Sequence, residues 1–167
     1  LPGVMNRRYG DHGRFSLPGQ QPKIALVYEE DHVGQGRWGF PDAAHPTTHI
    51  LKPPTGGNVR WVAAEHLALR IAAEAGLSAA DSFVIRTEDQ IALAVVRYDR
   101  IQLKDGTWYR VHQEDLCQAL GWSPKLKFQS SGGPGPADIV GCLRTHSSNF
   151  AEDEARFVLA LALNWVL

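Results

Sequence analysis

The sequence has few cysteines, no long apolar run and no excess of charge of either sign. Its 167 residues contain 17 Lys and Arg against 18 Asp and Glu, a net charge of −1. That balance argues against a general nucleic-acid-binding surface, because such surfaces cluster positive charge. No apolar run approaches the length of a membrane span, and no basic start followed by an apolar stretch indicates a signal peptide. We therefore expect neither direct nucleic-acid binding nor a membrane partner.

The two cysteines, Cys117 and Cys142, lie far apart and form no CxxC motif. We interpret them as reduced core residues of an intracellular, cytoplasmic protein. The chain begins at Leu1 without a methionine and ends in the apolar run Trp165-Val166-Leu167. A helix that stops on such a run normally continues or is covered, so we expect the chain to be a fragment.

The predicted class is α+β, with a β-rich lobe over residues 1–111 and the beginning of a helical lobe over residues 112–167. Runs of β-branched and apolar residues predict strands in the first lobe. They lie at residues 24–28, 47–51, 83–86, 91–98 and 108–111. Apolar residues make up 44% of the chain, which is enough for a real core.

One helix is predicted within the β-rich lobe, over residues 59–75, with Asn58 as its N-cap and Gly76 as its C′ residue. Glu65 falls at the edge of its apolar seam, where a carboxylate needs a partner. The seam has helical spacing and consists of Trp61, Ala64, Ala68, Ile71, Ala72 and Ala75.

Three helices are predicted in the second lobe, over residues 113–120, from residue 136 to about residue 144, and from residue 150 onward. The last is apolar nearly all round from residue 157 to residue 167. That pattern is typical of a central, buried helix. We expect Trp61 and Trp165 to be core residues. Trp38 follows a Gly-rich stretch and is the tryptophan that we expect to be exposed.

A polar turn from Phe15 to Lys23 places the hydroxyl of Ser16 at its start and leads into the strand at 24–28. A second lysine, Lys52, follows the strand at 47–51. A small-residue loop, a strand and a lysine on a neighbouring strand are parts from which an ATP phosphate site can be built. Taken alone, these features also fit an ordinary turn and a surface lysine.

Five segments, in matching order and spacing, resemble the HipA-like serine/threonine protein kinases, the toxin arm of bacterial toxin–antitoxin pairs. The resemblance covers residues 14–167 and implies a protein-kinase-like fold whose β-rich lobe binds the nucleotide. The segments are Phe15-Ser16-Leu17-Pro18-Gly19-Gln20-Gln21-Pro22-Lys23, Pro46-Thr47-Thr48-His49-Ile50-Leu51-Lys52, Glu65-His66-Leu67-Ala68-Leu69-Arg70, Arg97-Tyr98-Asp99-Arg100 and His112-Gln113-Glu114-Asp115-Leu116-Cys117-Gln118-Ala119-Leu120-Gly121.

The resemblance implies roles for individual residues toward Mg-ATP. Lys52 would contact the phosphates, and we infer that Glu65 supports it through an ion pair. Backbone groups would bind the rest of the nucleotide. The adenine would be held by the hinge residues Val96, Arg97 and Tyr98, and the phosphates by Pro18, Gly19, Gln20, Gln21, Pro22 and Lys23.

Ser16 matches an autophosphorylation position of the family. Its phosphorylation would add roughly −1.5 to −2 charges beside a loop that holds phosphates. Repulsion should then expel the loop and silence the enzyme. Two departures stand out: Pro18 has no N–H to donate, and Val96 replaces the glutamate that usually begins the hinge.

No catalytic residue is assigned within this chain. The family's Asp-x-His-x-x-Asn stretch and its metal-binding aspartate are expected beyond Leu167, and with them the Mg²⁺ ligands. His146-Ser147-Ser148-Asn149 is the nearest look-alike, but it lacks the aspartate. His45 and His49 lie at the entry to the strand at 47–51, where no third ligand is evident, so we predict no metal site there.

The function implied is the ATP-binding portion of a kinase that phosphorylates a protein hydroxyl and itself, with this stretch alone inactive. The implied partners are a HipB-like DNA-binding antitoxin and a translation-related protein substrate. Two alternatives stay open. The chain could be a non-catalytic, truncated kinase-like module that binds nucleotide or an antitoxin, or an unrelated α/β domain, which would show no thermal shift with ATP.

Overall fold

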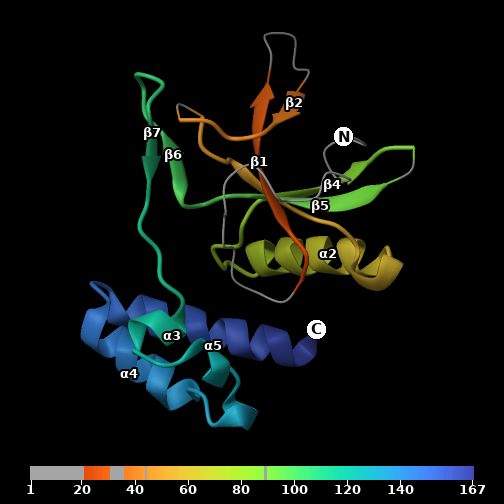
Figure 1. Ribbon diagram of the computed structural model, residues 1–167. Coiled ribbons are helices and arrows are strands. Elements are labelled where there is room, and N and C mark those ends of the chain that lie inside the picture. Colours follow the sequence, from red (N-terminus) through yellow and green to blue (C-terminus); the bar gives the residue numbers. More distant parts are fainter. Residues whose placement is uncertain (1–20, 31–35, 44, 89) are drawn as a thin grey trace. The chain divides into compact units, whose positions relative to one another are not determined.

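The computed structural model describes residues 21–30, 36–43, 45–88 and 90–167. The chain forms two compact units, one ending at Val111 and the other beginning at His112. The described part of the first unit contains two antiparallel sheets and one long helix, and the second unit is helical (Figure 1). This arrangement confirms the predicted α+β class.

The main sheet of the first unit has five antiparallel strands in the order β2-β1-β3-β5-β4. β-branched and other apolar residues dominate the inner strands, as expected for strands covered on both faces. The strands are β1 (Ile24–Glu30), β2 (Gly36–Gly39), β3 (His49–Lys52), β4 (Ser82–Arg86) and β5 (Ile91–Val96).

Helix α2 (Arg60–Glu74) covers one face of this sheet (Figure 1), after the short 3₁₀ turn η1 (Thr55–Gly57). Gly76 has a φ of 87°, which confirms it as the left-handed residue after the helix. The Oδ1 atom of Asn58 accepts a hydrogen bond from the amide of Arg60 at 3.1 Å. The side chain of Asn58 therefore satisfies a free amide of the first turn. The helix begins one residue later than predicted, with Val59 as its N-cap, so the prediction of Asn58 as the N-cap is wrong.

The prediction of which face of α2 packs against the sheet is wrong. Trp61 is 60% exposed, whereas its neighbour Val62 is 2% exposed and packs with Leu93 and Val95 of β5. Leu69, seven residues after Val62, packs against the same cluster. Apolar residues occupy more than one face of this helix, so periodicity alone could not select the face that the sheet covers.

The opposite face of the sheet carries a second apolar cluster, built on Ile24, Leu26, Leu51 and Ala94. Trp38 packs partly buried against this cluster, so the prediction of an exposed Trp38 is wrong. The loop character of the preceding residues was misleading, because Trp38 itself lies in β2 and pairs with β1.

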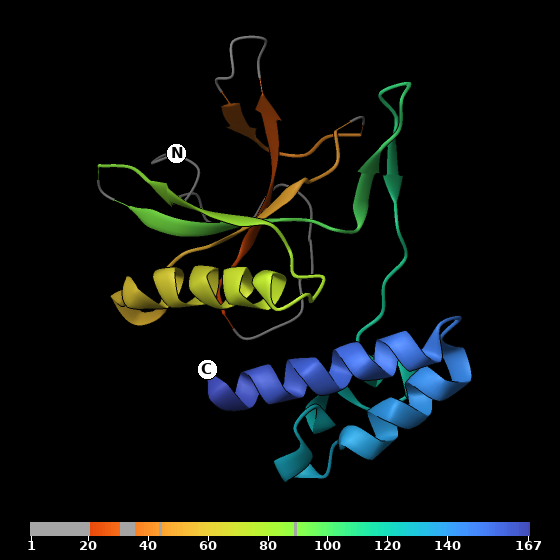
Figure 2. The same ribbon diagram turned by 180° about the vertical axis from the view of Figure 1, so that it is seen from behind.

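Strands β6 (Arg100–Gln102) and β7 (Trp108–Arg110) form a separate two-stranded sheet directly after the hinge segment. Gly106 has a φ of 85° at the tip of this hairpin, a conformation that residues with a Cβ rarely adopt. Figure 2 shows the hairpin standing apart from the five-stranded sheet.

The second unit contains two longer helices, α4 (Pro136–His146) and α5 (Phe150–Val166), which pack against each other. The prediction of a buried α5 is wrong: it has no buried residue, and Trp165 is 91% exposed. A helix that is apolar all round needs partners on several faces, and here α4 covers one side. The unit also contains α3 (Leu116–Ala119), η2 (Pro124–Leu126) and η3 (Gln129–Ser131).

No helix among the described residues combines the length and apolar character that crossing a membrane requires.

Candidate functional site

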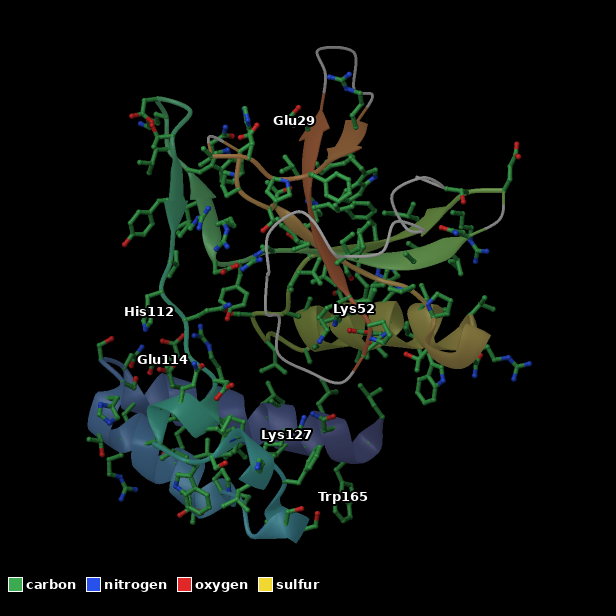
Figure 3. All side chains as sticks on the ribbon, viewed as in Figure 1. Glu29, Lys52, His112, Glu114, Lys127 and Trp165 are labelled. Atoms are coloured by element: carbon green, nitrogen blue, oxygen red, sulfur yellow. The ribbon has the colours of Figure 1, made fainter. Side chains whose placement is uncertain are left out.

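Lys52, the last residue of β3, forms an ion pair with Glu65 of α2, between its Nζ and the Oε1 of the glutamate. The register of the sheet explains this meeting, because Lys52 lies opposite Leu93, which packs toward Val62 of α2. The two side chains are 23% and 31% exposed, so the pair is partly shielded from water. Figure 3 labels Lys52, which lies between the sheet and the helix.

The loop predicted to hold phosphates is described only at its end. Ser16, Pro18, Gly19 and Gln20 lie outside the described residues. Gln21, Pro22 and Lys23 lead directly into β1. The side-chain amide of Gln21 donates to the carbonyl oxygen of Pro53 at 3.5 Å. The end of the loop therefore lies beside the residue that follows Lys52.

The hinge residues Val96 and Arg97 have both of their backbone amides engaged within the first unit. The amide of Val96 donates to the carbonyl of Asp81 at 2.8 Å, and the amide of Arg97 donates to the carbonyl of Thr48 at 2.9 Å. Tyr98 follows with 72% of its surface exposed. A nucleotide here would meet carbonyl oxygens, which can accept more than one hydrogen bond.

The side chain of Arg97 is buried and cannot contact a ligand directly. Its guanidinium makes a bidentate ion pair with Asp99, at 3.0 Å from Nε to Oδ1 and 2.7 Å from NH2 to Oδ2. Arg100 bonds the same carboxylate and the backbone carbonyl of Asp99. Burial opposes ionisation of Asp99, but the hydrogen bonds and charges of Arg97 and Arg100 outweigh it and lower its pKa.

Thr47 and Thr48 fasten this hinge to the sheet. The Oγ1 of Thr47 accepts a hydrogen bond from Arg97 at 3.1 Å, and the Oγ1 of Thr48 accepts one from the amide of Tyr28 at 2.8 Å. Both threonines are almost fully buried. Sequence reasoning missed these roles and the Arg97–Asp99 pair. The sequence did carry a signal for the threonine roles, since Thr47 and Thr48 are adjacent polar residues at the start of an otherwise apolar predicted strand.

His49 and His45 each have a specific hydrogen-bond partner. The Nδ1 of His49 lies 2.8 Å from Thr48 Oγ1, and burial lowers the pKa of this imidazole. The ring of His49 also lies within 5.7 Å, between centroids, of three aromatic rings: Tyr28, Trp38 and Phe83. A hydrogen bond and the charge of Asp42 raise the pKa of the exposed His45.

A polar contact links α2 to the sheet directly beside Glu65. The Nδ1 of His66 lies 2.9 Å from the Oγ of Ser82, the first residue of β4. His66 is four residues after Val62, on the side of the helix that faces the sheet. The backbone carbonyl oxygen of Asp81, next to Ser82, accepts a hydrogen bond from the amide of Val96. The helix that carries Glu65 is thus hydrogen-bonded to the start of β4, beside the residue that also binds the hinge.

The look-alike segment 146–149 organises the start of α5. The hydroxyl of Ser147 donates to Asp153 at 2.6 Å and accepts the amide of Asn149 at 2.9 Å. The side chain of Asn149 bonds Glu152. Asn149 is the N-cap residue of α5, but its side chain accepts no helix amide, so these contacts order the residues before the helix without capping its free amides.

Comparison with known proteins gives a consistent result. The family model "HipA-like C-terminal domain" matches residues 15–167. A putative kinase, Y4mE of Sinorhizobium fredii, is 38% identical over 154 residues, which are 92% of this chain and 36% of that protein. The serine/threonine-protein kinase toxin HipA of Shewanella oneidensis is 30% identical over 123 residues, 73% of this chain and 27% of that protein.

Among solved structures, HipA of Shewanella oneidensis, determined as a toxin–antitoxin complex of HipA, HipB and operator DNA, superposes with a TM-score of 0.68. The sequence identity is 24%, over 96% of this chain and 38% of that one. At this identity the likeness shows a shared fold. The chain spans between 27% and 38% of the length of these relatives.

Proposed function

This chain belongs to the HipA-like C-terminal domain family, and on that premise we propose that it is the ATP-binding portion of a serine/threonine protein kinase toxin. The observation that carries the proposal is the ion pair between Lys52 at the end of β3 and Glu65 in α2. A lysine on a sheet strand, fixed by a glutamate from the neighbouring helix, is the arrangement with which protein kinases bind ATP phosphates.

In this proposal Lys52 neutralises phosphate charge, and Glu65 keeps its ammonium group in place. The pair is partly exposed, so a phosphate can approach the lysine without opening the core. Gln21 brings the end of the loop to Pro53, immediately after Lys52. The described end of the loop is therefore close enough to Lys52 for the two to bind the same phosphate chain.

The adenine would be bound by the hinge at the end of β5. The backbone amides of Val96 and Arg97 already donate hydrogen bonds to the carbonyl oxygens of Asp81 and Thr48. We therefore propose that the carbonyl oxygens of Val96 and Arg97 accept hydrogen bonds from the adenine amino group. Burial of the Arg97 side chain against Asp99 keeps these carbonyls in a fixed position. The replacement of the usual glutamate by Val96 is compatible with this backbone contact.

The remaining parts of the proposal rest on the family resemblance. Pro18, Gly19 and Gln20 would complete the phosphate loop, and Ser16 would be the autophosphorylation site. Mg²⁺ would neutralise and bridge the phosphates. Among the described residues no group of three or more His, Cys, Asp or Glu could hold a metal ion, and we assign no metal ligand in this chain.

We further propose that the whole protein acts in the cytoplasm, phosphorylates a protein hydroxyl in a translation-related substrate, and pairs with a HipB-like antitoxin. The relative from Shewanella oneidensis was determined together with HipB and operator DNA, which supports the choice of partner. The small net charge of this chain supports contact with DNA through the antitoxin rather than directly.

Calorimetric titration of the chain with ATP, with and without Mg²⁺, tests the nucleotide site. We expect weak, saturable binding, because the metal ligands are expected beyond Leu167, and Lys52→Ala should weaken it by at least ten-fold while the circular dichroism spectrum stays unchanged. Lys125→Ala, which removes an exposed lysine of the second unit, is the matched control and should bind as the parent does. Absence of ATP binding by the unmodified chain, or equal binding by Lys52→Ala, would reject the proposed site.

A further inference from the structure

The five-stranded sheet of the first unit has two edges, β2 and β4, which differ in how they are protected. An exposed strand edge presents unpaired amides and carbonyls, and natural proteins usually blunt it with charges, prolines or irregular pairing. β2 has four residues, two of them glycines and one of them Arg37. β4 reads Ser-Phe-Val-Ile-Arg, pairs with β5 without a bulge, and carries its one charge at the last residue. β4 is therefore the edge that a further strand can join.

Alternate residues of β4 direct their backbone groups away from the sheet. The amide of Val96 donates to the carbonyl of Asp81, which lies directly opposite it in the register, so these two residues form a hydrogen-bonded pair. Such pairs alternate with non-hydrogen-bonded pairs along an antiparallel ladder. The amides and carbonyls of Ser82, Val84 and Arg86 consequently point outward. Among the described residues, no backbone hydrogen bond engages them.

The flank of α2 beside this edge is apolar and exposed. His66 marks that flank, because its ring contacts Ser82 of β4, whereas Glu65 on the other flank reaches Lys52 of β3. The helical period places a stripe of apolar residues, each four positions from the next, on the His66 flank. The stripe consists of Val59, Ala63 and Leu67, of which Val59 is 52% and Leu67 59% exposed.

The edge strand is complementary to a second copy of itself. In an antiparallel pairing centred on Val84, Ser82 of each copy lies opposite Arg86 of the other, and Phe83 lies opposite Ile85. No charge then faces a like charge, an arrangement that would destabilise the pair. Phe83, which is 38% exposed, gains an apolar neighbour. The outward amides and carbonyls of both copies satisfy each other.

The same two-fold symmetry brings the apolar stripes of the two α2 helices together. Both helices lie on the same side of the joined sheet, because α2 packs on one face of β4 and β5 (Figure 1). Val84 belongs to the cluster of Val62, so the centre of the strand pairing lies beside the first half of the helix. The small side chain of Ala63, next to Val62, allows a close approach there. Val59 and Leu67 are then covered on either side of it.

We propose that β4 and the stripe of Val59, Ala63 and Leu67 form an interface at which two copies of this chain join their sheets. The interface is isologous, the commonest kind in homodimers. β4 is only five residues long, so the contact is smaller than a standard interface, and the dimer should dissociate on dilution. Lys52 and Glu65 lie on the other flank of α2, and the proposal does not depend on nucleotide binding.

Sedimentation equilibrium of the chain, from micromolar to millimolar concentration, tests for the dimer. We expect a monomer–dimer equilibrium whose dissociation constant rises at least ten-fold in Leu67→Glu, which places a carboxylate in the apolar contact. Arg86→Pro, which removes an outward amide at the edge, should have an effect of the same size. The matched control is Trp61→Glu, since Trp61 is 60% exposed on the opposite flank of α2, and it should dimerise as the parent does. Circular dichroism verifies that each variant is folded.

Amide hydrogen exchange, measured by NMR at low and high concentration, locates the contact. Protection of the amides of Ser82 and Val84 should rise with concentration in the parent and stay constant in Leu67→Glu. A chain that remains monomeric at the highest concentration, or a dimer that Leu67→Glu and Trp61→Glu weaken equally, would overturn the proposal. Association through another surface, such as the exposed apolar side of α5, would leave these amides unprotected and would overturn it as well.

Discussion

The backbone amide of Arg97 donates to the carbonyl oxygen of Thr48 at 2.9 Å, which bonds the hinge to the residue directly before β3, the strand that ends at Lys52. The adenine side and the phosphate side of the proposed site are therefore connected through one short strand, β3. The side chain of Arg97 adds a second link, to Thr47 of the preceding segment. Substitutions along this strand should affect both ends of the nucleotide.

Replacing Glu65 with Gln tests whether the carboxylate positions Lys52. The amide keeps the shape but removes the charge, so the ammonium of Lys52 loses its fixed partner. We expect the Kd for ATP to rise by roughly three- to ten-fold, equivalent to about 0.7–1.4 kcal/mol. The free energy of unfolding should change by less than about 1 kcal/mol, because the pair is partly exposed.

The matched control for this prediction is Glu74→Gln in the same helix. Glu74 pairs with Arg70, and both side chains are mostly exposed. Calorimetry with ATP should show no change in this variant. Equal weakening by Glu65→Gln and Glu74→Gln would indicate a general effect of charge on ATP binding and would remove Glu65 from the site.

Replacing Asp99 with Asn should destabilise the first unit strongly. The substitution leaves two buried guanidinium groups, those of Arg97 and Arg100, without their shared carboxylate. Breaking a buried ion pair on one side costs about 3–5 kcal/mol. Urea unfolding measures this loss. Asp81→Asn is the control, because Asp81 is exposed and contributes through its backbone carbonyl, and it should unfold as the parent does.

The lowered pKa of Asp99 also predicts a pH dependence. The folded state holds this carboxylate ionised below its ordinary pKa of 3.8. The stability that it contributes is therefore complete above that value and is lost as the pH falls through the folded-state pKa. The parent should lose stability below about pH 4. Thr47→Val, which keeps Asp99, should retain this acid dependence. A flat profile in both proteins would contradict the assignment.

Much of the architecture could be predicted from the sequence, because strands and helices follow from local periodicity. The pairing of Lys52 with Glu65 could be predicted because each residue lies in a segment that resembles the kinase family. The ion pair between Arg97 and Asp99 could not be predicted, because the side chain of Asp99, two residues after Arg97, could equally have faced solvent. Trp38, which was expected to be exposed, is partly buried, and Trp61, which was expected to be buried, is exposed. The burial of each depends on which face of its strand or helix packs against the core, and this is a property of tertiary packing.

Acidification below neutral pH should destabilise the sheet through His49. Burial lowers the pKa of this imidazole below its ordinary 6.5, so the unfolded chain takes up a proton that the folded chain excludes. The stability contribution is present above about pH 6.5 and is lost as the pH falls through the folded-state pKa. Urea unfolding at pH 7.5 and 5.5 should show a smaller pH effect in His49→Gln than in the parent.

His45 provides the opposite sign for comparison. Its hydrogen bond to Asp42 and the charge of that carboxylate raise its pKa, so its contribution is complete below about pH 6.5 and is lost as the pH rises through the folded-state value. His45→Gln should therefore make the loss of stability on acidification larger. The same direction of change in His45→Gln and His49→Gln would contradict one of the two assignments.

The contact between His66 and Ser82 should stabilise α2 against the sheet and, through the adjacent Glu65, support the Lys52 site. Ser82→Ala removes the hydroxyl that lies 2.9 Å from the imidazole. We expect a loss of about 1 kcal/mol in the free energy of unfolding and weaker ATP binding. Urea denaturation and calorimetry measure the two effects. Ser78→Ala, at an exposed position before β4, should change neither.

A double-mutant cycle separates this hydrogen bond from general loosening of the helix. His66→Leu fills the same space without a ring nitrogen, and the pair His66→Leu with Ser82→Ala removes both partners. If the two groups stabilise the fold through each other, the combined loss should be smaller than the sum of the single losses by about 0.5–1 kcal/mol. Strict additivity would show that the observed contact contributes nothing. In that case apolar packing of α2, through residues such as Val62 and Leu69, would account for the position of Glu65.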